Sequence, residues 1–260
     1  MKNLLETAKK AAVEGGNVHA EYFEKGVEIG EKSGSYDLVT NADFKAEEKI
    51  VSVIRDVFPG HNILAEEEKY EDTESEYTWI VDPLDGTNNF ASGIPIFCSS
   101  VAVALNGEVV AGAIYDVTRN ELFYAGKNQG AFLNGKEIHV SPAESLAESI
   151  IATGFFYDRG SNMRDTLRNI EKFFLANVRG VRRLGAAAID LAYVASGRFE
   201  GFWEFSLYPW DFAAGKLIVE EAGGRVTGED GEELPLEKHF VVASNKHIHR
   251  DVLDILKSGD

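Results

Sequence analysis

The most constraining feature of this 260-residue chain is a short hydrophobic segment that runs directly into two aspartates. Trp79-Ile80-Val81 is followed by Asp82-Pro83-Leu84-Asp85-Gly86-Thr87. The β-branched and aromatic residues of the first segment predict a buried strand. Because Pro83 has no N–H to donate to a neighbouring strand, we expect the chain to leave the sheet at that residue.

The residues after this strand have the character of a phosphate-binding turn. Gly86 permits backbone conformations that other residues resist. If the turn opens a helix, Asp82 and Asp85 fall on one side of it. The free amides of Gly86 and Thr87 then point outward, where such groups hold phosphate oxygens. Paired aspartates can also be ordinary turn and cap residues, but so dense a sequence immediately after a strand favours a functional site.

Two further acidic segments lie far away in the sequence. Glu66-Glu67-Glu68 follows the apolar run Ile63-Leu64-Ala65, although an acidic triplet usually belongs to a solvated loop. Asp211 lies at the start of a helix predicted over 211–222, where a helix N-cap is the simplest interpretation. Neither segment indicates a site when it is taken alone.

Composition excludes several classes of protein. Hydrophobic residues make up 44% of the chain, enough for a packed core. The net charge of −17 argues against broad nucleic-acid binding, which depends on Lys and Arg. A phosphate site in so acidic a chain would therefore need bound cations. With one cysteine, no signal peptide and no membrane-spanning apolar run, we expect a cytoplasmic protein without membrane contact.

The order of predicted elements divides the chain into two halves that meet near residue 145. Helices are expected over 1–26 and 42–58, with a loop over 30–36 between them. Residues 96–140 predict an antiparallel sheet with Asn-Gly turns. The second half alternates strands with helices, which are expected over 162–176, 185–197, 211–222 and 247–257. A functional site between the two halves is the simplest arrangement.

Together these segments resemble the inositol monophosphatase family of lithium-sensitive, metal-dependent phosphatases. Asp82–Phe90 is similar to the first family signature, and Trp210–Gly215 is similar to the second. Asp37–Asp43 and Ala65–Glu67 match two further motifs. Four motifs in the same order make the resemblance specific, and it covers nearly the whole chain.

The resemblance implies a layered αβαβα sandwich of the α+β class. It places an antiparallel sheet in a metal-binding half, residues 1–145, and a smaller mixed α/β arrangement in a substrate-binding half, residues 146–260. The two halves are expected to form one compact catalytic unit. The same resemblance implies a homodimer.

The resemblance also implies two to three Mg²⁺ ions, for which Mn²⁺ can substitute. The implied ligands are the side chains of Glu66, Asp82, Asp85 and Asp211 and the backbone oxygen of Leu84. Oxygen ligands suit Mg²⁺, and carboxylates this crowded would otherwise repel one another and phosphate. Either Glu66 or Glu67 fits the ligand position, and Glu66 is favoured because it directly follows the small residue.

Three residues resemble the catalytic group of the family. Thr87 would orient the attacking water while Asp43 accepts its proton or holds the threonine side chain, and Glu67 would support this group from behind the metal ligands. Lys32 matches a position that approaches the waters of the third metal ion, although a single lysine on a loop can simply be solvated.

The implied substrate contacts come from both halves of the chain. They are Asp85, Gly86, Thr87, Gly185, Ala186, Ala187, Glu204 and Asp211. A carboxylate at Glu204 suits a polyol because it accepts hydrogen bonds from hydroxyl groups. Arg183 belongs to a basic cluster with Arg179 and Arg182, which fits a second phosphate, a dimer partner or a solvated surface.

The sequence therefore predicts a magnesium-dependent phosphomonoesterase that hydrolyses inositol monophosphate or a related polyol or sugar phosphate. A fructose bisphosphatase, or an enzyme with both activities, is the alternative within this class. An alternative from another class is a protein of the same fold that binds the transcription machinery.

Overall fold

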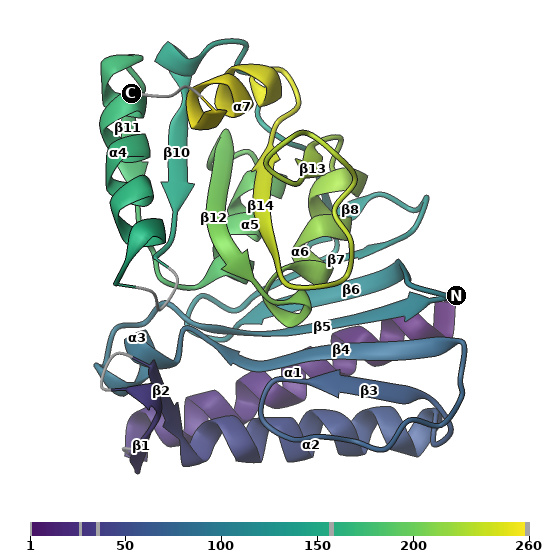
Figure 1. Ribbon diagram of the computed structural model, residues 1–260. Helices are drawn as coiled ribbons and strands as arrows, with labels where there is room; N and C mark the ends of the chain where they lie inside the picture. The colour runs from purple at the N-terminus through teal and green to yellow at the C-terminus, as the bar shows by residue number, and fades with distance from the viewer. Residues whose placement is uncertain (1, 26–27, 35–36, 156–158, 258–260) are drawn as a thin grey trace.

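The computed structural model describes residues 2–25, 28–34, 37–155 and 159–257, and Figure 1 shows them as alternating layers of helix and sheet. The helices are α1 (Lys2–Lys25), α2 (Asn41–Val57), α3 (Thr87–Ala91), α4 (Ser161–Leu175), α5 (Ala187–Ala195), α6 (Pro209–Glu221) and α7 (His249–Lys257), with a 3₁₀ turn η1 at Leu146–Glu148. None of these helices is long and apolar enough to cross a bilayer.

The larger sheet has seven strands in the order β3-β4-β5-β6-β7-β8-β9. Its strands are β3 (Asn62–Ala65), β4 (Tyr77–Asp85), β5 (Cys98–Leu105), β6 (Glu108–Asp116), β7 (Glu121–Gly126), β8 (Ala131–Leu133) and β9 (Lys136–Ile138). All neighbouring strands are antiparallel except β3, which runs parallel to β4. The antiparallel sheet predicted over residues 96–140 is present.

The smaller sheet has five strands in the order β11-β10-β12-β14-β13. Its strands are β10 (Ile150–Thr153), β11 (Gly180–Arg182), β12 (Gly201–Leu207), β13 (Arg225–Thr227) and β14 (His239–Ser244). β10 is parallel to β11 and β12, whereas β14 is antiparallel to β12 and β13. This is the mixed sheet expected in the second half of the chain.

Side-chain alternation along the strands builds a core on each face of the larger sheet. Trp79 and Val81 on β4 pack with α1 and α2, whereas Ile80 between them belongs to a cluster shared with α5, α6 and the smaller sheet. A third cluster, which contains Phe173 of α4 and Trp203 of β12, covers the outer face of the smaller sheet. The layered αβαβα arrangement is therefore confirmed.

Two predictions about local structure were wrong. The loop expected over 30–36 is largely a β-hairpin of β1 (Ile29–Gly34) and β2 (Asp37–Thr40), although residues 35–36 lie outside the described residues. The sheet also does not end at Pro83. Instead, β4 continues to Asp85 through a bulge, since Asp82 pairs with Ser100 and Asp85 pairs with Cys98. A bulge accommodates proline because its extra residue needs no ladder hydrogen bond.

The middle layer packs closely enough against the larger sheet to give a test of the fold. A Cβ atom added at Gly112 on β6 would lie 2.9 Å from Cα of Ala214 on α6. Because backbone cannot move aside easily, we expect Gly112→Ala to lower the free energy of unfolding by about 1–3 kcal/mol in denaturant titrations. Gly60→Ala is the control, since nothing lies within 4 Å of its added Cβ, and equal stabilities of the two variants would contradict this packing.

Candidate active site

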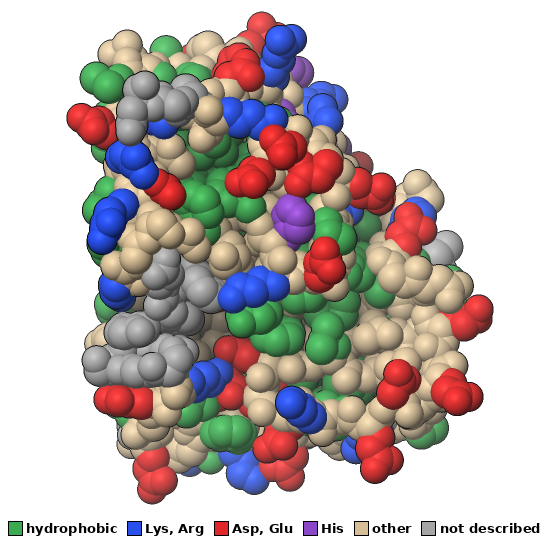
Figure 2. Space-filling model, viewed as in Figure 1, with side chains coloured by type: hydrophobic (Ala, Val, Ile, Leu, Met, Phe, Trp, Pro, Cys, Tyr) green, Lys and Arg blue, Asp and Glu red, His purple; other side chains and the backbone are tan. Residues whose placement is uncertain are grey.

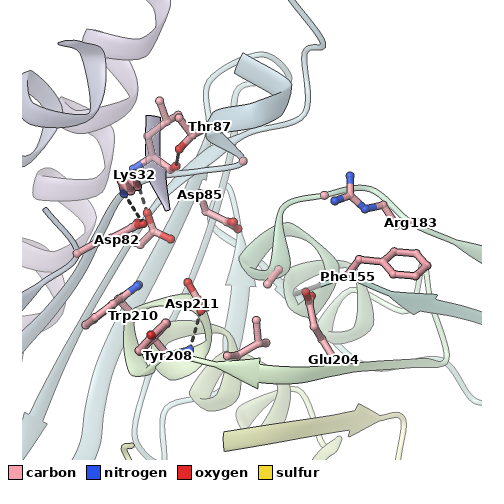
Figure 3. Close-up of a pocket in the computed structure, with 17 residues that line it drawn as sticks. Lys32, Asp82, Asp85, Thr87, Phe155, Arg183, Glu204, Tyr208, Trp210 and Asp211 are labelled. Carbon is pink, nitrogen blue, oxygen red and sulfur yellow. Dashed lines mark hydrogen bonds and ion pairs between the residues drawn. The ribbon is translucent and has the colours of Figure 1, made fainter. Parts of the chain in front are cut away.

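A cavity of about 430 Å³ lies where the two halves of the chain meet. Figure 3 shows Asp82, Asp85 and Lys32 on one side of this cavity. Glu204, Phe155 and Arg183 lie on the other side. The predicted site residues that line it are Lys32, Glu66, Asp82, Leu84, Asp85, Gly86, Thr87, Arg183, Gly185, Ala187, Glu204 and Asp211. Asp43, Glu67 and Ala186 do not line the cavity.

Three aspartates of the cavity share one arrangement. Asp82 Oδ1 accepts the Leu84 N–H at 3.0 Å, and Asp85 Oδ2 accepts the Ala188 N–H at 2.7 Å. Asp211, in the first turn of α6, accepts the Tyr208 N–H at 2.7 Å through Oδ2. Each carboxylate therefore has one oxygen fixed by a backbone amide, which orients the side chain.

The turn after Asp85 explains why glycine stands at position 86. Gly86 caps α3 with φ +95°, in the left-handed region that favours glycine. A Cβ at this position would lie only 2.9 Å from the Ile96 carbonyl oxygen. Asp85-Gly86-Thr87 opens helix α3, and this turn keeps Asp85 and Thr87 at the same cavity.

Glu66 follows β3, where Lys32 of the β1–β2 hairpin contacts it. Lys32 Nζ donates to Glu66 Oε1 at 2.8 Å and to Glu67 Oε1 at 2.5 Å. Burial lowers the pKa of Lys32, but Glu66 and Glu67 more than offset this and raise it above its usual range. Burial and the charge of Glu66 raise the pKa of Glu67 to about 7. Glu66 faces the cavity and Glu67 lies behind Lys32.

The carboxyl groups at the cavity disfavour one another's ionisation. Burial raises the pKa of Asp82 and of Asp211 well above the usual range, and the charge of Glu66 raises both further. Burial likewise raises the pKa of Asp85 to about 7. A bound cation would relieve this repulsion.

The donor set at this cavity fits a hard divalent cation. Carboxylate and carbonyl oxygens are the ligands that Mg²⁺ takes in proteins. In the described part of the chain, no three acidic, histidine or cysteine side chains are close enough together to hold a metal ion in their present positions. The carboxylates would therefore have to draw together around an ion, and Lys32 supplies positive charge beside Glu66 in this structure.

Asp43 lies behind the cavity and joins Thr87 to helix α2. Its Oδ1 is 2.9 Å from Thr87 Oγ1, while its Oδ2 accepts hydrogen bonds from the Thr40 hydroxyl at 2.6 Å and the Thr40 N–H at 2.8 Å. Burial raises the pKa of Asp43. Asp43 thus completes the capping box of α2, whose N-cap is Thr40, and contacts Thr87 with the same carboxyl group.

The opposite wall of the cavity carries Glu204, on β12. Burial raises the pKa of Glu204 to about 8, although the Arg183 charge opposes this rise. Gly154 lies directly against its carboxylate. Behind this wall lies Asp190 of α5, which is 1% exposed and whose Oδ1 has no hydrogen-bond partner among the described residues.

Several residues of the site were not found from the sequence. Glu47 of α2 accepts the N–H groups of Glu67 and Glu68 at 3.0 Å each and thereby shapes the acidic turn. Its spacing of four residues from Asp43 on one helix face was a usable signal. Tyr208 and Trp210 at the rim stack with ring centroids 4.8 Å apart, which sequence spacing did not indicate.

The family of this chain follows from its similarity to known proteins. The model of the inositol monophosphatase family matches residues 1–258. The chain belongs to this family. Membership supports a phosphatase and agrees with the resemblance found in the sequence.

Named relatives extend over almost the whole chain. Nus factor SuhB of Escherichia coli strain K12 is 42% identical over 256 residues, which cover 97% of this chain and 95% of the relative. Inositol-1-monophosphatase of Mesorhizobium japonicum is 44% identical over 228 residues, or 86% of this chain and 84% of the relative. Relatives thus carry two different kinds of name.

Solved structures agree with the fold. The extragenic suppressor protein suhB from Bartonella henselae superposes with a TM-score of 0.94 at 38% identity and covers 99% of this chain and 100% of that one. An IMPase/NADP phosphatase solved with Mg²⁺ and phosphate superposes with a TM-score of 0.81 at 30% identity, over 92% of this chain and 90% of that one.

The pKa of Glu204 predicts a pH-dependent stability in chelator. Its raised folded-state value means that its stabilising contribution is fully present below about pH 4.5 and is lost as the pH rises through about 8. The Gln side chain in Glu204→Gln cannot ionise. The melting temperature of this variant should therefore rise relative to that of the unchanged chain as the pH increases between these two values. Melting curves in EDTA measure this difference, and parallel profiles for the two proteins would contradict the assignment.

Proposed function

We propose that this chain is a magnesium-dependent phosphomonoesterase acting on inositol monophosphate or a related polyol or sugar phosphate. The observation that carries the proposal is the meeting of Glu66, Asp82, Asp85 and Asp211 at one cavity. These residues come from the end of β3, the bulge of β4 and the start of α6. The family and the relative solved with Mg²⁺ and phosphate support it.

The metal ligands that we propose are these four carboxylates and the Leu84 carbonyl oxygen, holding two to three Mg²⁺ or Mn²⁺ ions. When bound, such ions neutralise phosphoryl charge and lower the pKa of a coordinated water. Lys32 would remain beside Glu66 and Glu67 as a further positive charge at the edge of the site.

Thr87 and Asp43 are the residues that we propose for water activation. The Thr87 hydroxyl has one proton but lies near two acceptors, Asp43 Oδ1 at 2.9 Å and the Leu84 carbonyl at 3.0 Å. If the Leu84 carbonyl is engaged as a ligand, the hydroxyl donates to Asp43. The lone pairs of Thr87 Oγ1 then accept a hydrogen bond from water and orient it. Glu67 supports this arrangement by holding Lys32.

The substrate would lie between the metal ligands and the Glu204 wall. Glu204 would bind hydroxyl groups, and the small residues Gly185 and Ala187 at the start of α5 leave room for a ring. Asp85, Gly86, Thr87 and Asp211 would face the phosphate. Arg183 is exposed at the same cavity, so a substrate with a second phosphate, such as fructose bisphosphate, is the alternative within this class.

Removing one ligand charge should abolish catalysis without unfolding the chain. We expect Asp82→Asn to lower phosphate release from inositol monophosphate at least about 100-fold, since metal binding and its chemistry both depend on that carboxylate. Asp116→Asn is the matched control, because Asp116 is equally buried, at 1% exposure, but lies outside the cavity. Full activity of the unchanged chain in EDTA would rule out the mechanism.

Arg183 allows the two substrate classes to be told apart. If it binds a second phosphate, Arg183→Ala should lower kcat/KM for fructose bisphosphate by roughly tenfold or more, as expected for a lost hydrogen bond to a charged group. The value for inositol monophosphate should change little. Arg182→Ala, an exposed arginine outside the cavity, is the control, and equal losses on both substrates would leave the bisphosphate without support.

We propose a cytoplasmic homodimer in which residues 1–145 and 146–260 form one catalytic unit. The relatives named Nus factor SuhB favour a second role in binding the transcription machinery. Such a role would use the outer surface, where Figure 2 shows Asp and Glu side chains spread over the visible face with Lys and Arg among them. A partner retained by the Asp82→Asn chain would separate this role from catalysis.

A further inference from the structure

A buried histidine on α1 contacts the bulge that carries the metal ligands. His19 is fully buried, and its Nε2 lies 2.7 Å from the Pro83 carbonyl oxygen, across 64 residues of sequence. Burial lowers the pKa of His19 to about 4, so the ring is neutral at pH 7. Because a carbonyl oxygen only accepts hydrogen bonds, Nε2 carries the single ring proton and donates it to Pro83.

The bulge explains why Pro83 uses a side chain as its partner. β3 pairs with β4 only as far as Ala65 opposite Val81. On the other edge, the pairing with β5 skips from Asp82 to Asp85. The Pro83 carbonyl therefore lies where β4 pairs with neither β3 nor β5. A buried carbonyl without a hydrogen-bond donor is costly in free energy. His19 supplies the donor.

The same peptide unit also holds a proposed metal ligand. The Pro83 carbonyl and the Leu84 N–H belong to one planar peptide group. His19 donates to the carbonyl at one end of this group, and at the other end the Leu84 N–H donates to Asp82 Oδ1 at 3.0 Å. Any rotation of the plane moves both ends together. The orientation of His19 is thus transmitted to the Asp82 carboxylate.

Packing keeps the His19 ring in place. Its centroid lies 6.0 Å from that of Phe90 and 5.8 Å from that of Phe97, both in edge-on arrangements. Both phenylalanines are buried, at 3% and 0% exposure. Since Phe90 belongs to α3, which begins at Thr87, the ring also packs beneath the turn that follows Asp85.

We propose that His19 is a positioning residue of the metal site, which fixes the Pro83–Leu84 peptide and through it the Asp82 carboxylate. This inference rests on the proposed metal-dependent function. His19 itself lines no part of the cavity. Its effect would therefore fall on metal affinity, as is typical of partners that orient a metal ligand.

Three His19 variants and one control variant of the full chain test this role. Mg²⁺ is titrated into each of them in a calorimeter. His19→Leu lacks a donor and should weaken Mg²⁺ binding by about tenfold. His19→Gln places an amide N–H near the position of Nε2 and should restore binding to within about twofold of the unchanged chain, whereas the shorter His19→Asn should not. The Gln and Asn pair decides the question if the Leu variant does not fold.

Ser99→Ala is the matched control for lost attachment of α1. It removes another long-range hydrogen bond to this helix, from Ser99 Oγ to the Ala12 carbonyl at 2.6 Å, and should lower the melting temperature without changing Mg²⁺ affinity. Unaltered Mg²⁺ affinity in both His19→Leu and His19→Asn, or an equal loss in Ser99→Ala, would overturn the role of His19.

The outcomes also separate this inference from the proposed function. If the unchanged chain binds no Mg²⁺, the metal-dependent function fails and the role of His19 fails with it. If the unchanged chain binds Mg²⁺ and the Leu and Asn variants bind it equally well, only the role of His19 fails. Amide hydrogen exchange at Leu84 gives a metal-free measurement, since exchange should quicken in His19→Asn and remain slow in His19→Gln.

Discussion

Mutual repulsion among the carboxyl groups at the cavity is the constraint on which the rest of this site depends. Asp82, Asp85 and Asp211 are held at one cavity, and burial raises the pKa of each. A cavity of this kind is stable only if its charges are neutralised by protons or by cations. The protein fixes one oxygen of each aspartate with a backbone amide. That arrangement restrains the orientation of each carboxylate.

The layered fold makes such an arrangement possible by bringing together the ends of elements. A bulge in β4, the start of α6 and the end of β3 meet at the cavity, and the first turn of α5 supplies the amide for Asp85. The ends of a helix leave backbone groups without partners inside the helix, and a bulge leaves backbone groups without partners in the sheet. These groups are free to orient side chains, which the interior of a helix or strand cannot do.

The resemblance of the sequence to a known family implied the layered fold and most of the residues that line the cavity, because the motifs are dense and their residues lie next to strongly patterned elements. The sequence did not predict how the chain passes Pro83, since a proline can end a strand or sit in a bulge. The hairpin of β1 and β2 was missed because both strands are short and β1 is mostly polar. His19 and Glu47 were missed for another reason. Their partners are 64 and 20 residues away. No local pattern indicates the contact of His19, whereas the spacing of four residues from Asp43 was the one local signal for Glu47.

The middle layer of helices has a consequence for how the chain unfolds. One continuous core cluster contains Ile80 and Cys98 of the larger sheet, Leu191 and Phe212 of the central helices and Val241 of the smaller sheet. Neither sheet can expose its inner face without stripping the same two helices from the other. The boundary near residue 145 therefore separates two sheets rather than two autonomous folding units, and loss of either half would leave the other with an open hydrophobic face.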